Sequence, residues 1–153
     1  MRVIEPWVAE PLHRFLSESS ARLALLMTAS GQVVAQHGFT RALDVMTASA
    51  LGAAIVASTE ELARQMGAGP FRALSHQGRA QGLFLSAFTV PRARWIVLVV
   101  YDSDSSLGLV QLFFDQLVRE LQAAAPEGEA PRDVLAADFE SDLNASLRSL
   151  FGR

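Results

Sequence analysis

Residues 95–101 read Trp-Ile-Val-Leu-Val-Val-Tyr, and this run decides the fold because it is apolar on both sides of an extended chain. A half-buried strand alternates apolar and polar side chains, whereas a strand covered on both faces is apolar throughout. The run therefore predicts a central β-strand with another layer of structure on each face. Residues 102–106 then offer several N-cap candidates for a helix, whose apolar side chains recur at three- and four-residue spacing as far as Leu121.

The elements before this run are predicted from the same periodicities. A short amphipathic helix follows Pro11, which suits its first turn, and a long helix over 40–66 stops at the glycine-rich stretch 67–70. Turn residues separate the remaining runs of strand character, and the first two make a hairpin around 29–31. These strands are expected at 23–28, 32–37, 71–76 and 82–89.

This order, α-β-β-α-β-β-β-α, predicts a mixed α/β (α+β) domain of three layers, α/β/α, with a five-stranded, mostly antiparallel sheet in the middle. We expect the domain to span residues 1–125. A linker rich in Pro, Gly and Glu follows at 126–133, and 134–153 is predicted to be an amphipathic helix. Its apolar stripe has strict four-residue spacing and contains Leu135, Phe139, Leu143, Leu147 and Phe151.

The composition limits the classes of function. Half of the 153 residues are hydrophobic, so a folded core is expected, and the absence of cysteine excludes disulfides, zinc–thiolate sites and thiol nucleophiles. A net charge of −3 lacks the basic footprint of a nucleic-acid-binding protein. The N-terminus lacks the apolar segment of a signal peptide, and the longest apolar stretch, 45–57, is shorter than the roughly 20 residues that span a bilayer. We therefore expect a cytoplasmic protein that neither binds nucleic acid nor inserts into membranes.

No motif for catalysis emerges from the sequence. His13, His37 and His76 have no metal-ligand spacing, and the glycines at 67–69 lack the Lys-Ser/Thr of a phosphate-binding loop. A Gly-x-Ser-x-Gly nucleophile elbow is also missing from the sequence. The sequence thus predicts no active site of its own, no metal and no cofactor.

Two segments indicate protein partners instead. Residues 45–57 of the long helix are apolar or small nearly all round, which favours a self-association surface over a helix wholly buried within its own domain. The terminal helix either folds back onto the domain or enters a groove of a partner as a helical anchor. Its anchors in the second case are Leu143, Leu147, Leu150 and Phe151.

The order of elements and several residues together resemble the roadblock/LC7 family over residues 10–125. The most specific stretch is 96–102 followed by 106–110, and 62–67 and 76–78 fit as well. Within that family these segments, together with the Leu-rich end at 142–151, are most similar to the bacterial MglB branch. The partner of that branch is the Ras-like small GTPase MglA.

The resemblance implies a homodimer and a regulatory function. Roadblock proteins dimerise through the long helix and the edge strand after it, here through Ala50, Gly52, Phe71, Ala73 and Leu74. Matching positions place the contacts with an MglA-like GTPase at Ala53, Ala54, Ala57, Ser58 and Glu61. The chain is then expected to stimulate GTP hydrolysis by ordering the GTPase's own catalytic residues, in the control of cell polarity or motility. The tail anchors are expected to touch the GTPase at a separate surface and to influence nucleotide exchange.

Two alternatives to a GTPase activator are left open by the sequence. A roadblock scaffold would hold a GTPase, another roadblock subunit or a further polarity protein without accelerating hydrolysis. A small-molecule sensor would need a ligand-sized pocket with buried polar groups, and no polar residues converge in the apolar strands.

Overall fold

The computed structural model describes residues 2–3, 5–39, 43–126, 144–145 and 147–150. Its helices are α1 (Ala9–Ser19), α2 (Val45–Gln65) and α3 (Leu107–Ala124), and a short 3-10 helix, η1 (Pro6–Val8), precedes α1. Residues 144–145 and 147–150 are helical as well. The strands are β1 (Arg2–Val3), β2 (Leu23–Thr28), β3 (Val33–Gly38), β4 (Leu74–Gln77), β5 (Gln81–Val90) and β6 (Ala93–Asp102).

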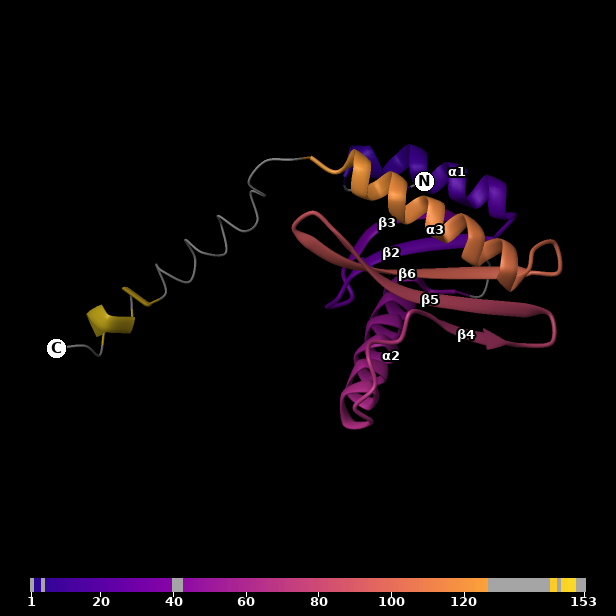
Figure 1. The fold of residues 1–153 in the computed structure, drawn as a ribbon. Coiled ribbons are helices and arrows are strands. Elements are labelled where there is room, and N and C mark those ends of the chain that lie inside the picture. Colours follow the sequence, from indigo (N-terminus) through magenta and orange to yellow (C-terminus); the bar gives the residue numbers. More distant parts are fainter. Residues whose placement is uncertain (1, 4, 40–42, 127–143, 146, 151–153) are drawn as a thin grey trace.

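The predicted fold class is confirmed. The strands form one sheet in the order β1-β3-β2-β6-β5-β4, and every neighbouring pair is antiparallel. Figure 1 shows α1 and α3 side by side over one face of this sheet and α2 against the other. The two-residue β1, which pairs with β3 at one edge, joins the five predicted strands.

The face-to-face alternation along β6 determines which layer each side chain joins. Trp95, Val97, Val99 and Tyr101 belong to the core under α1 and α3. The side chains between them, from Ile96 to Val100, belong to the core under α2. Each of these residues is buried, so β6 is the strand covered on both faces that its sequence predicts.

The core under α1 and α3 is built from large side chains. Phe114 on α3 packs edge-on against Phe84 and Phe88 of β5, with ring centroids 5.2 and 5.8 Å apart. Trp7 stacks on Trp95 at 5.4 Å. Pro11 lies buried in the first turn of α1, as predicted.

The limits of α2 follow from its caps. The helix begins at Val45 rather than at 40, because Asp44 has extended backbone and its carboxylate accepts a hydrogen bond from the Met46 N–H at 3.3 Å. Thr47 Oγ1 also donates to this carboxylate, which is the main reason why the pKa of Asp44 is lowered. At the other end Gly67 adopts a positive φ of 65°, and the Ala68 N–H donates to the Ala63 carbonyl at 3.0 Å. The predicted helix stop is confirmed.

The strand β4 is shorter than predicted and begins at Leu74 instead of Phe71. The carbonyl of Arg72 accepts a hydrogen bond from Ser86 Oγ at 2.6 Å. Ser86 is buried, and its hydroxyl needs a partner. This side-chain bond therefore takes the place of a ladder bond, and residues 71–73 run beside β5 without pairing with it.

Gly38 provides a test of the β3 end of the sheet. Its φ is +89°, and a Cβ there would lie 2.8 Å from Leu16 Cδ2 and 3.0 Å from the Arg22 carbonyl carbon. We expect Gly38→Ala to lower the free energy of unfolding by at least about 2 kcal/mol in chemical denaturation. Gly69→Ala is the matched control, since nothing lies within 4 Å of that position and its φ is ordinary. Equal stability of the two variants would show that neither the positive φ nor the close packing of Gly38 matters for the end of β3.

Candidate functional site

The inner face of α2 approaches the sheet through small side chains. Its buried residues are Ala48, Ser49, Gly52, Ala53, Val56 and Ala63. A Cβ on Gly52 would lie 3.3 Å from Met27 Sδ and 3.4 Å from Leu85 Cδ2, so a larger residue would press on these two side chains. Cover by α2 is therefore thin, and it rests on strands β2, β5 and β6.

The outer face of α2 carries large apolar side chains in solvent. Met46, Leu51, Leu62 and Met66 are between 57% and 70% exposed. Apolar surface gathered in this way on one element is typical of a protein-binding site. One alternative from the sequence was a helix wholly buried within its own domain. The exposed side chains of α2 exclude that alternative for the single chain. We define the α2 contact surface as Met46, Ala50, Leu51, Ala54, Ala57, Ser58 and Leu62, which are exposed on α2, together with the exposed Met66 directly after the helix.

The residues predicted to touch a GTPase do not all lie on this surface. Ala54, Ala57 and Ser58 are exposed in the middle of it, and Glu61 is partly exposed one turn further on. Ala53 is buried beside the turn at Gly31, where a Cβ would meet the Ala53 methyl at 3.5 Å. Ala53 therefore supports the surface from beneath in the single chain.

Ion pairs fix the charged groups at the C-terminal half of α2. Glu61 accepts a hydrogen bond from Gln65 Nε2 at 3.1 Å and forms an ion pair with Arg64. Glu60 pairs with Arg94 at the start of β6, and this bond raises the pKa of Arg94. The pair ties the C-terminal half of α2 to the sheet. Ser58 Oγ donates to the Ala54 carbonyl at 2.8 Å, which leaves its oxygen free only to accept.

The predicted dimer residues lie in two places. Ala50 is exposed on α2, whereas Gly52 faces Met27 and Leu85 of its own sheet. Phe71 is 49% exposed, and Ala73 beside it is exposed as well. The fifth residue, Leu74, is half-buried at the start of β4.

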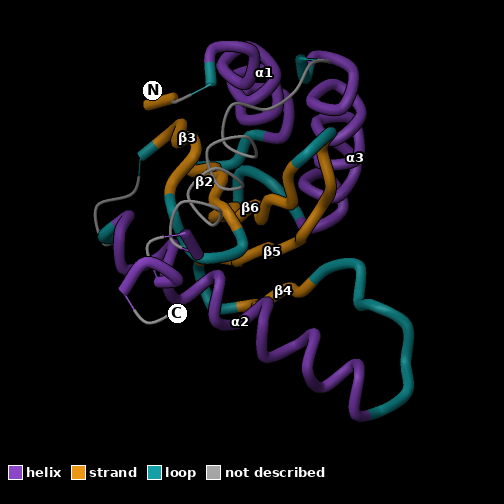
Figure 2. Tube along the Cα trace, turned by 90° about the vertical axis from the view of Figure 1, so that its left-hand side faces the viewer, coloured by secondary structure: helices purple, strands orange, loops and turns teal. Residues whose placement is uncertain are grey.

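The edge strand β4 leaves backbone groups open. It pairs with β5 on one side, and within the described residues no strand pairs with its other side. An edge strand with free N–H and C=O groups is a template for pairing with another chain. Figure 2 shows that β4 and α2 lie at the same side of the molecule, with α2 extending past the sheet.

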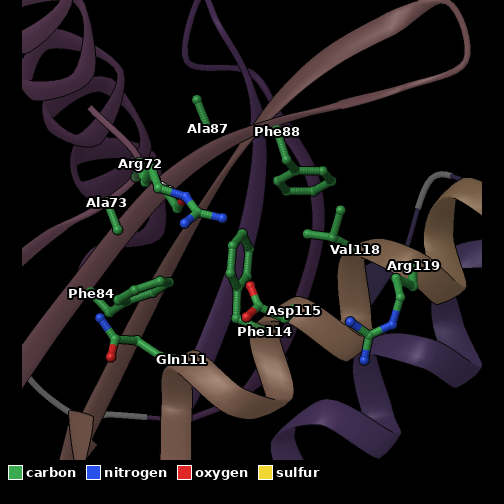
Figure 3. Close-up of a pocket in the computed structure, with 11 residues that line it drawn as sticks. Arg72, Ala73, Phe84, Ala87, Phe88, Gln111, Phe114, Asp115, Val118 and Arg119 are labelled. Atoms are coloured by element: carbon green, nitrogen blue, oxygen red, sulfur yellow. Dashed lines mark hydrogen bonds between the residues drawn. The ribbon is translucent and has the colours of Figure 1, made fainter. Parts of the chain in front are cut away.

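An open groove lies on the opposite face of the sheet, between α3 and the segment 71–73. Its volume is 680 Å³, and Figure 3 shows the rings of Phe84, Phe88 and Phe114 along it, with the Arg72 side chain reaching across from the strand side. Ser86 is its buried polar residue, and that hydroxyl already donates to the Arg72 carbonyl. The groove therefore does not provide the converging, buried polar groups that a small-molecule sensor requires. Sequence analysis did not predict it, because it depends on where β4 begins.

Two histidines far apart in the sequence meet in the structure. His13 Nδ1 on α1 lies 3.0 Å from His37 Nε2 on β3, and the Nδ1 atom of His37 is buried without a partner in the described part of the chain. Burial of its ring, followed by the charge of His13, lowers the pKa of His37. His76 is exposed on β4. No group of three or more potential metal ligands occurs among the described residues.

The comparisons with known proteins fit this geometry. The family model for the Roadblock/LC7 domain matches residues 8–101. The chain belongs to the roadblock/LC7 family. Its matched span runs from η1 to the end of β6 and so includes α2 and β4. A comparison with curated protein sequences finds no match. No described helix has the length and hydropathy that a membrane span requires.

Among solved roadblock structures, MglB proteins are similar to this chain. Myxococcus xanthus MglB is 26% identical with a TM-score of 0.70, and the match covers 78% of this chain and 95% of that one. The gliding protein MglB from Thermus thermophilus is 27% identical with a TM-score of 0.69, covering 80% and 94%. A structure described as MglB with tetrameric arrangement is 28% identical with a TM-score of 0.67, covering 77% and 87%. The predicted resemblance to the MglB branch is confirmed.

The histidine pair predicts how stability depends on pH. Because the pKa of His37 is lower in the folded chain, the unfolded chain binds its proton more tightly. Stability contributed by neutral His37 is therefore present above the ordinary histidine value and is lost as the pH falls toward the folded pKa. We expect the melting temperature to fall between about pH 7.5 and 5.5, and to fall less in His37→Gln. His76→Gln is the control, and an identical pH response in both variants would contradict this explanation.

Proposed function

We propose that this chain is a non-catalytic, dimeric regulator that binds an MglA-like Ras-family GTPase and stimulates its GTP hydrolysis. The observation that carries the proposal is the α2 contact surface, where Ala54, Ala57 and Ser58 stand exposed between large apolar side chains. Similarity to MglB structures supports a GTPase as the partner. Three of the five positions that the resemblance assigns to GTPase contact belong to this surface, namely Ala54, Ala57 and Ser58.

The chemistry of this surface suits a protein partner. Alanine and serine keep the middle of the helix flat, and they lose little side-chain entropy when a partner covers them. Leu51 and Leu62 on either side supply apolar area to bury. Glu61 adds one negative charge at the end of the row, although its carboxylate is shared with Arg64 and Gln65. Ala53 is buried, so it would support the exposed Ala54, Ala57 and Ser58 without touching the partner.

None of the residues that define the α2 contact surface is an arginine. Arg64, the arginine of the α2 sequence, is exposed and pairs with Glu61 one turn earlier. An arginine finger must reach the transferring phosphoryl group and is worth about 10³–10⁵ in rate. We therefore attribute stimulation to ordering of the GTPase's own arginine and glutamine, which binding of its switch regions on α2 would favour.

Dimer formation would use the open edge of β4 together with α2. Pairing of two β4 strands joins two sheets into one and removes both free edges. Ala50, Phe71, Ala73 and Leu74 lie along this side of the chain, whereas Gly52 would contribute by bringing α2 close to its own sheet. A dimer also places two α2 helices next to each other, so that one GTPase contacts both.

The tail would reach the GTPase at a second surface and influence nucleotide exchange. Leu147 and Leu150 are 44% and 74% exposed, as anchors for a partner must be. Leu143 and Phe151 lie outside the described residues.

Single-turnover GTP hydrolysis tests the proposal directly. The rate of the host's MglA-like GTPase is measured with and without the chain, and we expect a large acceleration. Ala57→Arg places a charged, bulky side chain in the middle of the row and is expected to weaken binding by at least about tenfold, or 1.4 kcal/mol. Ala123→Arg, on the exposed side of α3, is the matched control.

The same assay separates the mechanisms. Arg64→Ala is expected to keep the acceleration within about twofold, whereas loss of an arginine finger would cost about 10³–10⁵. Binding without acceleration would establish the scaffold in place of the activator. Absence of both binding and acceleration would overturn the GTPase as partner.

The dimer is tested at Ser75 on β4. The Gly78 N–H donates to the Gln81 carbonyl at 2.8 Å, so alternation along the strand directs the Ser75 N–H away from β5. Proline at such an edge position leaves the protomer folded but removes the donor. We expect Ser75→Pro to raise the dimer dissociation constant by at least about fivefold in sedimentation velocity, with Ser75→Ala unchanged. A wild-type monomer at micromolar concentration would contradict the dimer.

A further inference from the structure

The groove between α3 and the segment 71–73 lies outside the α2 contact surface, and of the proposed dimer residues Ala73 alone is among those that line it. It lies on the face of the sheet that α1 and α3 cover, and its 680 Å³ can accept several large side chains. Phe84, Phe88 and Phe114 line it from within, and Val118 lines its α3 side (Figure 3). An open groove of this shape suits the apolar side chains of a helix better than an enclosed ligand.

The rim of the groove is positively charged. Arg72 stands on one side and Arg119 on the other, with Asp115 as the one carboxylate among the lining residues. Both arginines are exposed, and neither forms an ion pair with another described residue. The rim therefore favours a segment that carries several acidic side chains next to apolar ones.

The chain has such a segment directly after α3. Residues 127–142 contain six acidic residues and one arginine, and the apolar stripe continues from Leu143 into the helix beyond. Within that helix Leu147 and Leu150 stand in solvent. A helix this short is marginal on its own in water, so a surface that covers its apolar side would stabilise it.

The connection between α3 and the tail is long enough for docking. Arg119, the last groove residue on α3, precedes the end of that helix at Ala124 by five residues, or about 8 Å. The linker of 126–133 can span up to about 27 Å when extended, which allows the tail to return antiparallel to α3. A tether of this length gives an effective concentration in the range of about 1 mM, so weak contacts suffice.

We propose that the groove receives the chain's own tail, with Leu147 and Leu150 entering between Phe88 and Val118 and the acidic residues meeting Arg72 and Arg119. Docking would bury the two leucines that the structure leaves exposed. Docking of the tail does not depend on the proposed function, but its consequence does. If a GTPase is the partner, the tail must leave the groove before Leu147 and Leu150 can contact that GTPase.

The absence of cysteine makes a distance measurement direct. Spin labels are placed at Leu112→Cys, an exposed position of α3 outside the groove, and at Ser149→Cys in the tail helix. Double electron–electron resonance is recorded on the full chain without GTPase, diluted with excess unlabelled chain so that only intrachain distances contribute. We expect a short, narrow distance population. A broad distribution of long distances in the chain without further substitutions would overturn docking of the tail on its own chain. So would a short distance that appears only without dilution, because it would then arise between two chains.

Charge reversal tests the site of docking. Arg72→Glu combined with Arg119→Glu is expected to lower the ratio of short to long distances by at least about twofold, given the size of exposed ion pairs. Arg79→Glu, an exposed arginine of the β4–β5 turn, is the matched control. Reversing Asp138, Glu140 and Asp142 to arginine in the doubly reversed chain should restore the short population. If the short-distance population is unchanged when both arginines are reversed, the tail docks at a different site and the proposal is wrong. Because no GTPase is present, these results do not depend on the proposed activity.

Discussion

The structure depends on the requirement that both faces of β6 be kept from water. Seven consecutive apolar residues in the middle of the sheet cannot be exposed on either side without a large loss of hydrophobic free energy, about 1.5–3 kcal/mol for each large side chain. The chain meets this requirement unequally. Two helices, α1 and α3, cover one face with phenylalanine, leucine and valine side chains. One helix, α2, covers the other with alanine, serine and glycine.

This inequality explains why α2 is the side on which partners are expected. Small residues allow the helix to lie close to Met27 and Leu85, but they leave it without the bulk to hide its own outer side chains. A polar outer face would have completed a monomer. Instead the outer face carries exposed leucine and methionine, which is typical of a surface that another protein covers. The open edge of β4 is a second candidate contact, because no described strand pairs with the backbone groups on its outer side.

Local patterns were sufficient for most of the fold, and long-range contacts account for what they missed. The patterns that predict the β2–β3 hairpin, β6 and α3 each lie within the element or next to it in the sequence, and these elements were predicted. The start of β4 depends on the hydrogen bond between Ser86 and Arg72, fourteen residues apart, and no periodicity contains it. The sequence predicts a covered helix at 45–57, but an almost uniformly apolar stretch does not say which face meets the sheet. The family resemblance assigned partner roles to Gly52 and Ala53, but their side of α2 meets the chain's own sheet and turn.

The positions of the candidate surfaces have a consequence for how binding events combine. The α2 contact surface and the groove beside α3 lie on opposite faces of one sheet, so a protein bound on α2 does not cover the groove. Competition between a GTPase and the docked tail must then act through the tail leucines themselves, which cannot be in the groove and on a partner at once. Coupling of this kind needs no change in the domain, because its strength equals the free energy of docking. Since that free energy is set by exposed ion pairs and a few apolar contacts, the tail can be held in the free protein and still be released by a partner.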